Sequence, residues 1–241
     1  ALAYTIGVYM LVTFLPLVKG NFVIAALIST AVVVPISYVI ERFIIRRLYG
    51  ESLDYAIIAT YAVLLIGVDL IKWIWGVNPY PMSDPVGEYL SLGGLTIPVY
   101  RIVIVVAAFL LFGALNFFFK KSIIGKIVVA SLEDKDGVRC LGIKVDRYFS
   151  MVFILGSALA ALGGILYAPI TSIHPYMGSM VLLLSFSVVI VGGLGNLNGT
   201  FVSALALGLV MSFTARYWPP GTETMVFIVM AVMLIIKPIE V

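Results

Sequence analysis

The chain has 241 residues, of which 62% are hydrophobic and 11% are charged, and its formal net charge is +3. Soluble domains carry roughly 25% charged residues, so this composition excludes an ordinary soluble protein and indicates an integral membrane protein. One Cys and one His provide neither an internal disulfide nor a metal-binding cluster, and no basic run is dense enough to predict nucleic-acid binding.

Long apolar runs divide the chain into predicted membrane-spanning helices, each of which needs roughly 20 mostly apolar residues to cross the hydrocarbon. Four runs come before a charged region, at residues 1–18, 21–40, 55–75 and 102–119. Four more follow it, at residues 148–170, 181–191, 201–215 and 224–236. The last three are short enough to predict tilted, partial or locally broken helices. We therefore expect an all-α, polytopic transmembrane helical bundle with about eight spans, in one domain over residues 1–241.

The distribution of Lys and Arg predicts the orientation of these spans. If the second span exits to the cytoplasm, eleven of the fifteen basic residues, Lys237 included, lie inside and four lie outside, and both termini are inside. Aromatic side chains then gather near the outer boundary, where they are typical of headgroup contacts: Trp73, Trp75, Tyr80, Tyr100, Tyr217 and Trp218. Asp69 and Lys72, one turn apart, predict either an intramembrane pair or, more in keeping with the nearby Trp residues, an interfacial anchor. The Pro- and Gly-rich outer loop, residues 76–99, predicts turns or short extended segments.

Residues 120–147, which we call the charged island, contain seven of the fifteen Lys and Arg residues and four of the twelve acidic residues. A loop this polar cannot lie in hydrocarbon, so it must project into water, where a soluble partner can bind it. The chain contains no G-x-x-x-x-G-K-[ST] loop for phosphate groups, so any ATP must be bound by another subunit.

Small residues mark one face of the fifth span. Gly156, Ala160 and Gly164 recur at intervals of four, a pattern that lets another helix backbone approach closely. Helix packing is the favoured interpretation, and lining a route or moving during transport is the alternative.

The segment from Gly192 to Gly199 has four glycines and two asparagines, which disfavour a regular helix. Two interpretations stay open: a cavity-lining or re-entrant segment, and a tight cytoplasmic turn between two helices. Serines nearby, including Ser203, either contact a polar solute or bond to their own helix backbone. The candidate residues of the translocation pathway are Ser185, Ser187, Gly192, Gly193 and Gly195.

Three stretches carry a family resemblance: CLGIKVDRYFSMVFILGSALAALGGILYAP (140–169), HPYMG (174–178) and VVIVGGLGNLNGTFVSALALGL (188–209). Through these stretches the chain resembles the LivH-type permease subunits of bacterial and archaeal ABC importers for branched-chain amino acids. The resemblance covers nearly the whole chain. Its first residues, ALAYTIGVYM, resemble the second conserved stretch of that family. The resemblance therefore implies an additional N-terminal helix that is missing from this sequence.

In that family a short helix before the LGI sequence packs into a groove on a cytoplasmic ATPase, so the resemblance places coupling on residues 130–142. The implied contact residues are Glu133, Asp134, Lys135, Asp136 and Arg139, with Gly137 and Gly142 shaping the turns. The alternative is a merely solvated loop, because exposed charges often contribute little.

The resemblance implies a permease, not an enzyme, in a prokaryotic inner or plasma membrane. It would pair with a second permease, two ATPase subunits that hold ATP and Mg²⁺, and an external solute-binding protein, and would itself hold no cofactor. Its solutes would be branched-chain amino acids, with urea, amides or sugars as alternatives. A secondary transporter or channel would place ionisable groups inside the membrane. The central spans have almost none, Asp69 being the nearest, which favours an external energy source. A purely structural scaffold is a third possibility.

Overall fold

The computed structural model describes residues 1–48, 53–82, 84–92, 95–193 and 195–236, and it divides into two compact units, Ala1–Ser179 and Met180–Val241. Lys237, which we counted on the inside, lies outside the described residues. The helices of the first unit are α1 (Leu2–Leu17), α2 (Phe22–Phe43), α3 (Leu53–Trp75), α4 (Val99–Lys121), α5 (Ile123–Glu133), α6 (Lys135–Cys140) and α7 (Val145–Tyr167). Helix α8 (Met177–Gly192) begins in this unit and continues into the second, which also holds α9 (Leu197–Tyr217) and α10 (Thr222–Ile236). Short 3₁₀ turns follow α2, α7 and α9: η1 (Ile45–Leu48), η2 (Ala168–Ile170) and η3 (Pro219–Gly221).

The helices confirm a polytopic helical membrane protein. Five described helical segments are long and apolar enough to cross a membrane: Phe22–Leu48, Tyr55–Trp75, Val99–Lys121, Val145–Ile170 and Leu197–Tyr217. The other three predicted spans form shorter apolar helices, at Leu2–Leu17, Met177–Gly192 and Thr224–Ile235. The seventh run was predicted too short, because the Asn196 side chain caps α9 and starts the helix before the apolar run.

Helices α1, α2 and α7 form the core of the first unit. The buried residues of α2 are spaced four apart and include three polar side chains: Ala25, Ser29, Val33, Ser37 and Glu41. The hydrophobic effect does not drive helices together within lipid. Membrane helices associate through close packing, which small residues allow, and through hydrogen bonds. Gly7 of α1 meets Ala161 of α7 so closely that a Cβ at Gly7 would lie 2.8 Å from the Ala161 Cβ.

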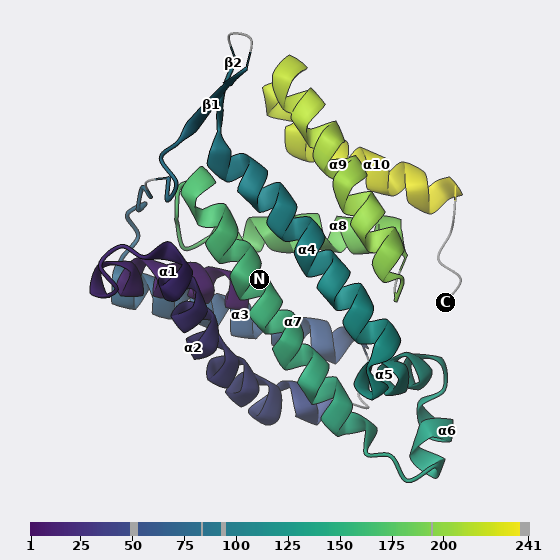
Figure 1. Ribbon diagram of the computed structural model, residues 1–241. Helices are drawn as coiled ribbons and strands as arrows, with labels where there is room; N and C mark the ends of the chain where they lie inside the picture. The colour runs from purple at the N-terminus through teal and green to yellow at the C-terminus, as the bar shows by residue number, and fades with distance from the viewer. Residues whose placement is uncertain (49–52, 83, 93–94, 194, 237–241) are drawn as a thin grey trace. The chain divides into compact units, whose positions relative to one another are not determined.

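The outer loop contains a hairpin, which confirms the predicted short extended segments. Strand β1 (Tyr89–Leu92) pairs antiparallel with β2 (Leu95–Pro98), and Ser91 lies opposite Thr96. Figure 1 shows this hairpin at one end of α4 and the short helices α5 and α6 at the other end. Within the first unit, the charged island and the outer loop therefore lie at opposite ends of a membrane-length helix.

Aromatic side chains from α1, the end of α3 and the loop after it pack together. The Tyr9 ring lies 5.4 Å from that of Trp75 and 6.3 Å from that of Tyr80, between ring centroids. The Trp75 indole donates a hydrogen bond to Thr13 Oγ1 (2.9 Å). Such partly polar rings are typical of a membrane–water boundary, where we expect Trp75 and Tyr80 to lie.

Asp69 and Lys72 form the expected pair. Their carboxylate oxygen and ammonium nitrogen are 2.9 Å apart, and the same ammonium group lies 4.6 Å from the centroid of the Tyr176 ring. The Asp69 side chain is 75% exposed, so this pair lies on the surface of the unit and not in its core.

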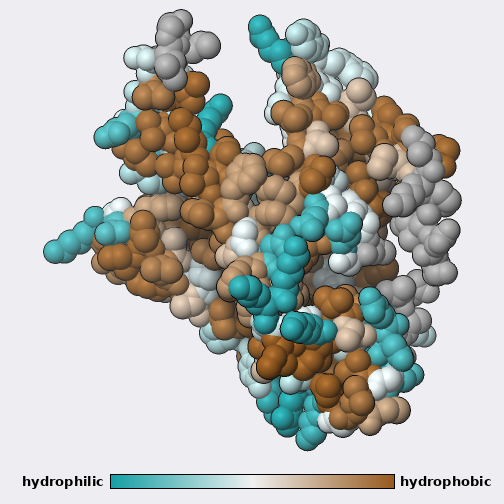
Figure 2. Space-filling model, turned by 45° about the vertical axis from the view of Figure 1, so that its right-hand side comes forward, coloured by the Kyte–Doolittle hydropathy of each residue, from teal (hydrophilic) through white to brown (hydrophobic). Residues whose placement is uncertain are grey.

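Apolar side chains cover much of the surface. Tyr100 is the one buried residue of α4, and α4 displays exposed Ile, Val, Leu and Phe side chains along its length. Figure 2 shows broad hydrophobic areas, with hydrophilic side chains gathered toward the end that carries α5 and α6. A surface of this kind fits lipid or a second membrane subunit better than water.

Candidate coupling and translocation sites

The charged island folds into two short helices set by side-chain caps. Ser122 accepts a hydrogen bond from the Ile124 amide (3.1 Å) and starts α5. Asp134 ends α5, and its carboxylate accepts a hydrogen bond from the Gly137 amide (2.9 Å), which starts α6. Gly142 follows α6 with a φ of +77°, a left-handed conformation that glycine adopts without strain.

The candidate coupling residues lie on and around α6 with different exposures. Glu133, Asp134, Asp136, Arg139 and Gly142 are exposed, and Lys135 and Gly137 are half-buried. The Lys135 ammonium lies 5.8 Å from the centroid of the Phe149 ring on α7. Val138 is buried on the inner side of the helix. Helix α6 thus packs an apolar residue inward and leaves acidic groups available to a partner.

Arg139 connects α6 to the first turn of α7. Its guanidinium lies 3.3 Å from the Asp146 carboxylate and 3.7 Å from that of Asp136. Both pairs are solvent-exposed, so each contributes little stability by itself. Their geometric effect is to join the tip of the island to a membrane-spanning helix.

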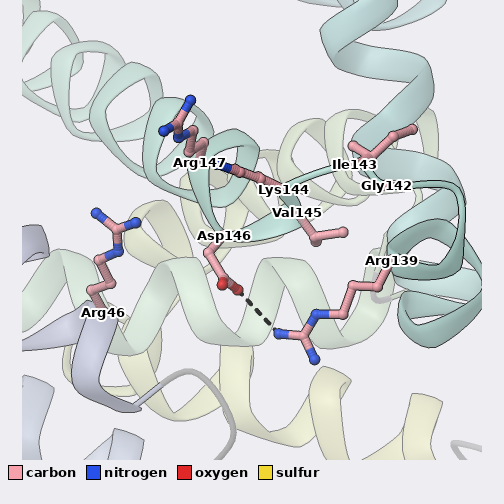
Figure 3. Close-up of a pocket in the computed structure, with 8 residues that line it drawn as sticks. All are labelled: Arg46, Arg139, Gly142, Ile143, Lys144, Val145, Asp146 and Arg147. Carbon is pink, nitrogen blue, oxygen red and sulfur yellow. Dashed lines mark hydrogen bonds and ion pairs between the residues drawn. The ribbon is translucent and has the colours of Figure 1, made fainter.

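A basic pocket lies beside this connection. Its volume is about 440 Å³, and its lining residues are Arg46, Arg139, Gly142, Ile143, Lys144, Val145, Asp146 and Arg147. In Figure 3 the Asp146 carboxylate points to the Arg139 guanidinium, while Arg46 approaches from the end of another helix. Arg46 and the island, assigned to the same side of the membrane by the Lys and Arg count, thus meet at one pocket.

Sequence reasoning did not identify Glu41, a buried acid close to this end of α2. Its side chain is fully buried, and the hydroxyl of Ser150 on α7 donates a hydrogen bond to Glu41 Oε1. Within the described residues, Glu41 Oε2 has no hydrogen-bond partner. The available signal was an acid placed one position after a long apolar run and directly before Arg42.

The translocation candidates surround a tight turn between α8 and α9. Gly193 and Gly195 have φ values of +88° and +82°, and the Asn196 carboxamide oxygen accepts a hydrogen bond from the Gly199 amide (3.0 Å). The helices are close at this point, because a Cβ at Gly192 would lie 2.5 Å from Thr200 Cα. This geometry is a helix–turn–helix, which fits both a re-entrant segment and a cytoplasmic turn; Leu194 lies outside the described residues.

The serines near this turn differ from one another. Ser187 is buried and bonds the Leu183 carbonyl of its own helix (3.1 Å). Ser203 bonds across to the Val188 carbonyl (2.8 Å) and so ties α9 to α8. Ser185 is exposed. Of the three, Ser185 is the one whose side chain is exposed.

The glycine stripe of α7 is also not uniform. A Cβ at Gly164 would lie 2.7 Å from the Tyr4 carbonyl oxygen, so α1 packs directly on this residue. Ala160 is half-buried, whereas Gly156 is exposed, and a Cβ added at Gly156 would meet nothing within 4 Å among the described residues. The close contacts with α1 are made at Gly164, which belongs to the predicted face, and at Ala161, which does not.

Comparisons with known proteins agree with one another. The family described as "Branched-chain amino acid transport system / permease component" matches residues 1–237. The high-affinity branched-chain amino acid transport system permease protein LivH of Salmonella typhimurium is 30% identical over 229 residues, which cover 92% of this chain and 73% of that protein. LivH of Escherichia coli is 25% identical over the same lengths. The probable branched-chain amino acid transport permease protein LivH of Methanocaldococcus jannaschii is 27% identical over 235 residues, 90% of this chain and 70% of that protein. No solved structure matches the chain.

Proposed function

This chain belongs to the permease-component family of branched-chain amino acid transport systems, and on that premise we propose that it forms half of the membrane passage of an ABC importer. The observation that carries the proposal is a family match that runs from residue 1 to residue 237. The chain is a multi-pass membrane transport subunit and not an enzyme. Energy therefore has to come from other subunits.

Four kinds of partner complete the proposed importer. A second permease, identical or related, covers part of the exposed apolar surface; α4, with Tyr100 as its one buried residue, supports such a contact. Two cytoplasmic ATPases hold ATP and Mg²⁺ and contact the exposed acids at the end of α5 and on α6. An external solute-binding protein delivers the solute at the end that carries the β1–β2 hairpin. Lipid covers the remaining apolar faces.

The contacts around α6 support a mechanical route for coupling. When ATP draws the two ATPases together, they displace α6, and the Arg139–Asp146 pair passes this movement to the start of α7. The hydrogen bond between Ser150 and Glu41 joins α7 to α2 one turn farther along. Because α1, α2 and α7 pack as one core, they move together, and the passage alternates between outward and inward access.

A branched-chain amino acid presents a zwitterion and an apolar side chain. A route for such a solute needs hydrogen-bonding groups and smooth aliphatic walls, without a charged group that would bind it tightly. Ser185 and the glycine backbone from Gly192 to Gly195 offer this chemistry at the α8–α9 turn. Urea, amides and sugars, with their many hydrogen-bonding groups, are the alternative solutes.

Uptake of radiolabelled leucine into vesicles tests the proposal. The chain is reconstituted with its second permease, ATPases and binding protein, and uptake is measured with ATP, with a non-hydrolysable ATP analogue and with urea or ribose as competitors. We expect uptake that requires ATP hydrolysis and all three kinds of protein partner. Leucine uptake by the chain alone, driven by an ion gradient, would contradict the proposal.

The alternative function is a secondary transporter that works without an ATPase. Glu41 bears directly on it, because secondary transporters often use buried carboxyl groups. Its position does not favour such a role. It lies two residues before the end of α2, at the island end, and its carboxylate is held by Ser150. A fixed contact between two helices explains it better than a site that must bind and release protons across the membrane.

A further inference from the structure

We propose that the basic pocket between η1, α6 and the start of α7 binds the phosphate group of an anionic phospholipid. This inference goes beyond solute transport and needs no partner subunit. The pocket volume of about 440 Å³ falls in the range of roughly 300–1,000 Å³ that is usual for small-ligand sites. Its lining residues supply the chemistry.

Charge is the first argument. Four of the eight described lining residues are basic, and Asp146 is the one acid among them. Asp146 already pairs with Arg139, which leaves Arg46, Lys144 and Arg147 facing a site with excess positive charge. Arg46 comes from a different part of the chain than Lys144 and Arg147, so folding brings basic side chains to one pocket. A bound anion offsets their charge and accepts charge-assisted hydrogen bonds.

The first turn of α7 adds to this charge. Helix α7 begins at Val145, and the side chain of its N-cap residue, Lys144, makes no capping hydrogen bond. Backbone N–H groups at a helix start carry partial positive charge and attract anions. Val145, Asp146 and Arg147 all line the pocket, so the helix start and the basic side chains act on the same volume.

The position of the pocket favours a lipid over a soluble anion. Arg46 lies near the end of the candidate span Phe22–Leu48, and Val145 begins the candidate span Val145–Ile170. Residues at the ends of spans lie at the level of the lipid headgroups. Just before Arg46, the Val39 and Phe43 side chains are 52% and 59% exposed and provide an apolar surface for an acyl chain. Basic pockets between helices on the cytoplasmic side are a known form of headgroup site.

An acidic group of the ATPase is the competing occupant. Arg139 and Gly142 belong both to the predicted ATPase contact and to the pocket lining, whereas Arg46 lies in η1 and Arg147 in the first turn of α7, at the ends of two candidate spans. The side of the pocket formed by Arg46 and Arg147 is therefore nearer to the spans than the predicted ATPase contact. We assign it to the lipid and treat ATPase binding as an outcome of the test.

Native mass spectrometry of the purified chain measures the proposed binding. Dioleoylphosphatidylglycerol, dioleoylphosphatidylcholine and soluble glycerol phosphate are titrated separately. We expect the anionic lipid to bind at least about tenfold more tightly than the other two, since a few charge-assisted bonds suffice for that ratio. The variant Arg46→Gln/Lys144→Gln/Arg147→Gln should lose this preference. Should it fail to fold, Arg46→Gln and Lys144→Gln singly, both at exposed positions, carry the same test.

A matched control separates the pocket from general surface charge. The variant Lys120→Gln/Lys121→Gln/Lys126→Gln removes the same charge from exposed positions of the same island, away from the pocket. It should change lipid affinity by no more than about twofold. Three results would each overturn the proposal: an equal loss of anionic-lipid affinity in both variants, equal affinity for the two lipids, or binding of glycerol phosphate as tight as that of the anionic lipid. So would a pocket variant that keeps its lipid preference but no longer co-purifies with the ATPase.

Discussion

Ser150 on α7 donates a hydrogen bond to the fully buried carboxylate of Glu41 on α2, and the two residues are 109 positions apart in the chain. A buried polar group that loses its partner costs roughly 1–3 kcal/mol. The contact lies at the end of the α1–α2–α7 core, near the charged island. It therefore links the stability of the core to the segment that we propose to receive force from the ATPase.

Removing the donor should destabilise the protein. For Ser150→Ala we expect a loss of about 1–3 kcal/mol in the free energy of unfolding, because Glu41 Oε1 stays buried without its donor. Thermal unfolding in detergent measures the change. Ser187→Ala is the control, since Ser187 is also buried and bonds the Leu183 carbonyl of its own helix, as Ser150 bonds the Asp146 carbonyl, but within the described residues it has no contact like that with Glu41. Similar losses for the two variants would show that the Glu41 contact has no special weight.

Packing of α1 on α7 should depend on Gly164 and not on Gly156. Gly164→Val places new atoms against the Tyr4 backbone, and overpacking of this kind costs about 1–3 kcal/mol. Gly156→Val meets open space in this chain, so we expect the melting temperature to stay nearly unchanged. If Gly156→Val leaves stability intact but prevents pairing with the second permease in size-exclusion chromatography, its face belongs to that interface. Equal destabilisation by both would contradict the α1–α7 arrangement.

Charge reversal at the end of α5 and on α6 should uncouple the ATPase. The variant Glu133→Lys/Asp136→Lys changes two exposed acids and keeps Asp134, whose carboxylate caps α6. We expect ATP hydrolysis that no longer rises when loaded binding protein is added, together with weaker co-purification of the ATPase. Glu88→Lys reverses an exposed acid in the outer loop and should not change ATPase co-purification. Normal stimulation in the α6 variant would remove these acids from the contact.

The turn between α8 and α9 should require a residue that tolerates a left-handed backbone. Gly193 has a φ of +88°, and for most other residues this conformation costs roughly 1–2 kcal/mol. Gly193→Leu should therefore lower leucine uptake several-fold while membrane insertion persists. Gly193→Asn should retain more uptake, since Asn adopts this region more readily. If both variants transport normally, neither the turn nor this part of the proposed route depends on Gly193.

Some features of the site were accessible from local sequence alone. The charge of residues 120–147 excluded them from the membrane, and Asp134 followed three residues later by Gly137 is compatible with a helix cap. The structure places α5 and α6 there. The break at Gly192 to Gly199 was equally visible, but its geometry was not, because glycine permits both an unwound segment and a turn. The turn is visible only from two contacts in the structure. Thr200 lies against Gly192, and the Asn196 side chain accepts a hydrogen bond from the Gly199 amide.

The sequence by itself determined that this is a membrane protein, where its helices lie along the chain, where its charged island lies and which family it belongs to. Composition and the local order of residues carry that information. Which faces of the helices meet was decided only in three dimensions. A soluble helix reveals its inner face through polar residues on the other side, but a membrane helix is apolar all round. For this reason the contact at Gly164 in place of Gly156, the Glu41–Ser150 hydrogen bond and the convergence of Arg46 with Arg147 appear only in the tertiary structure.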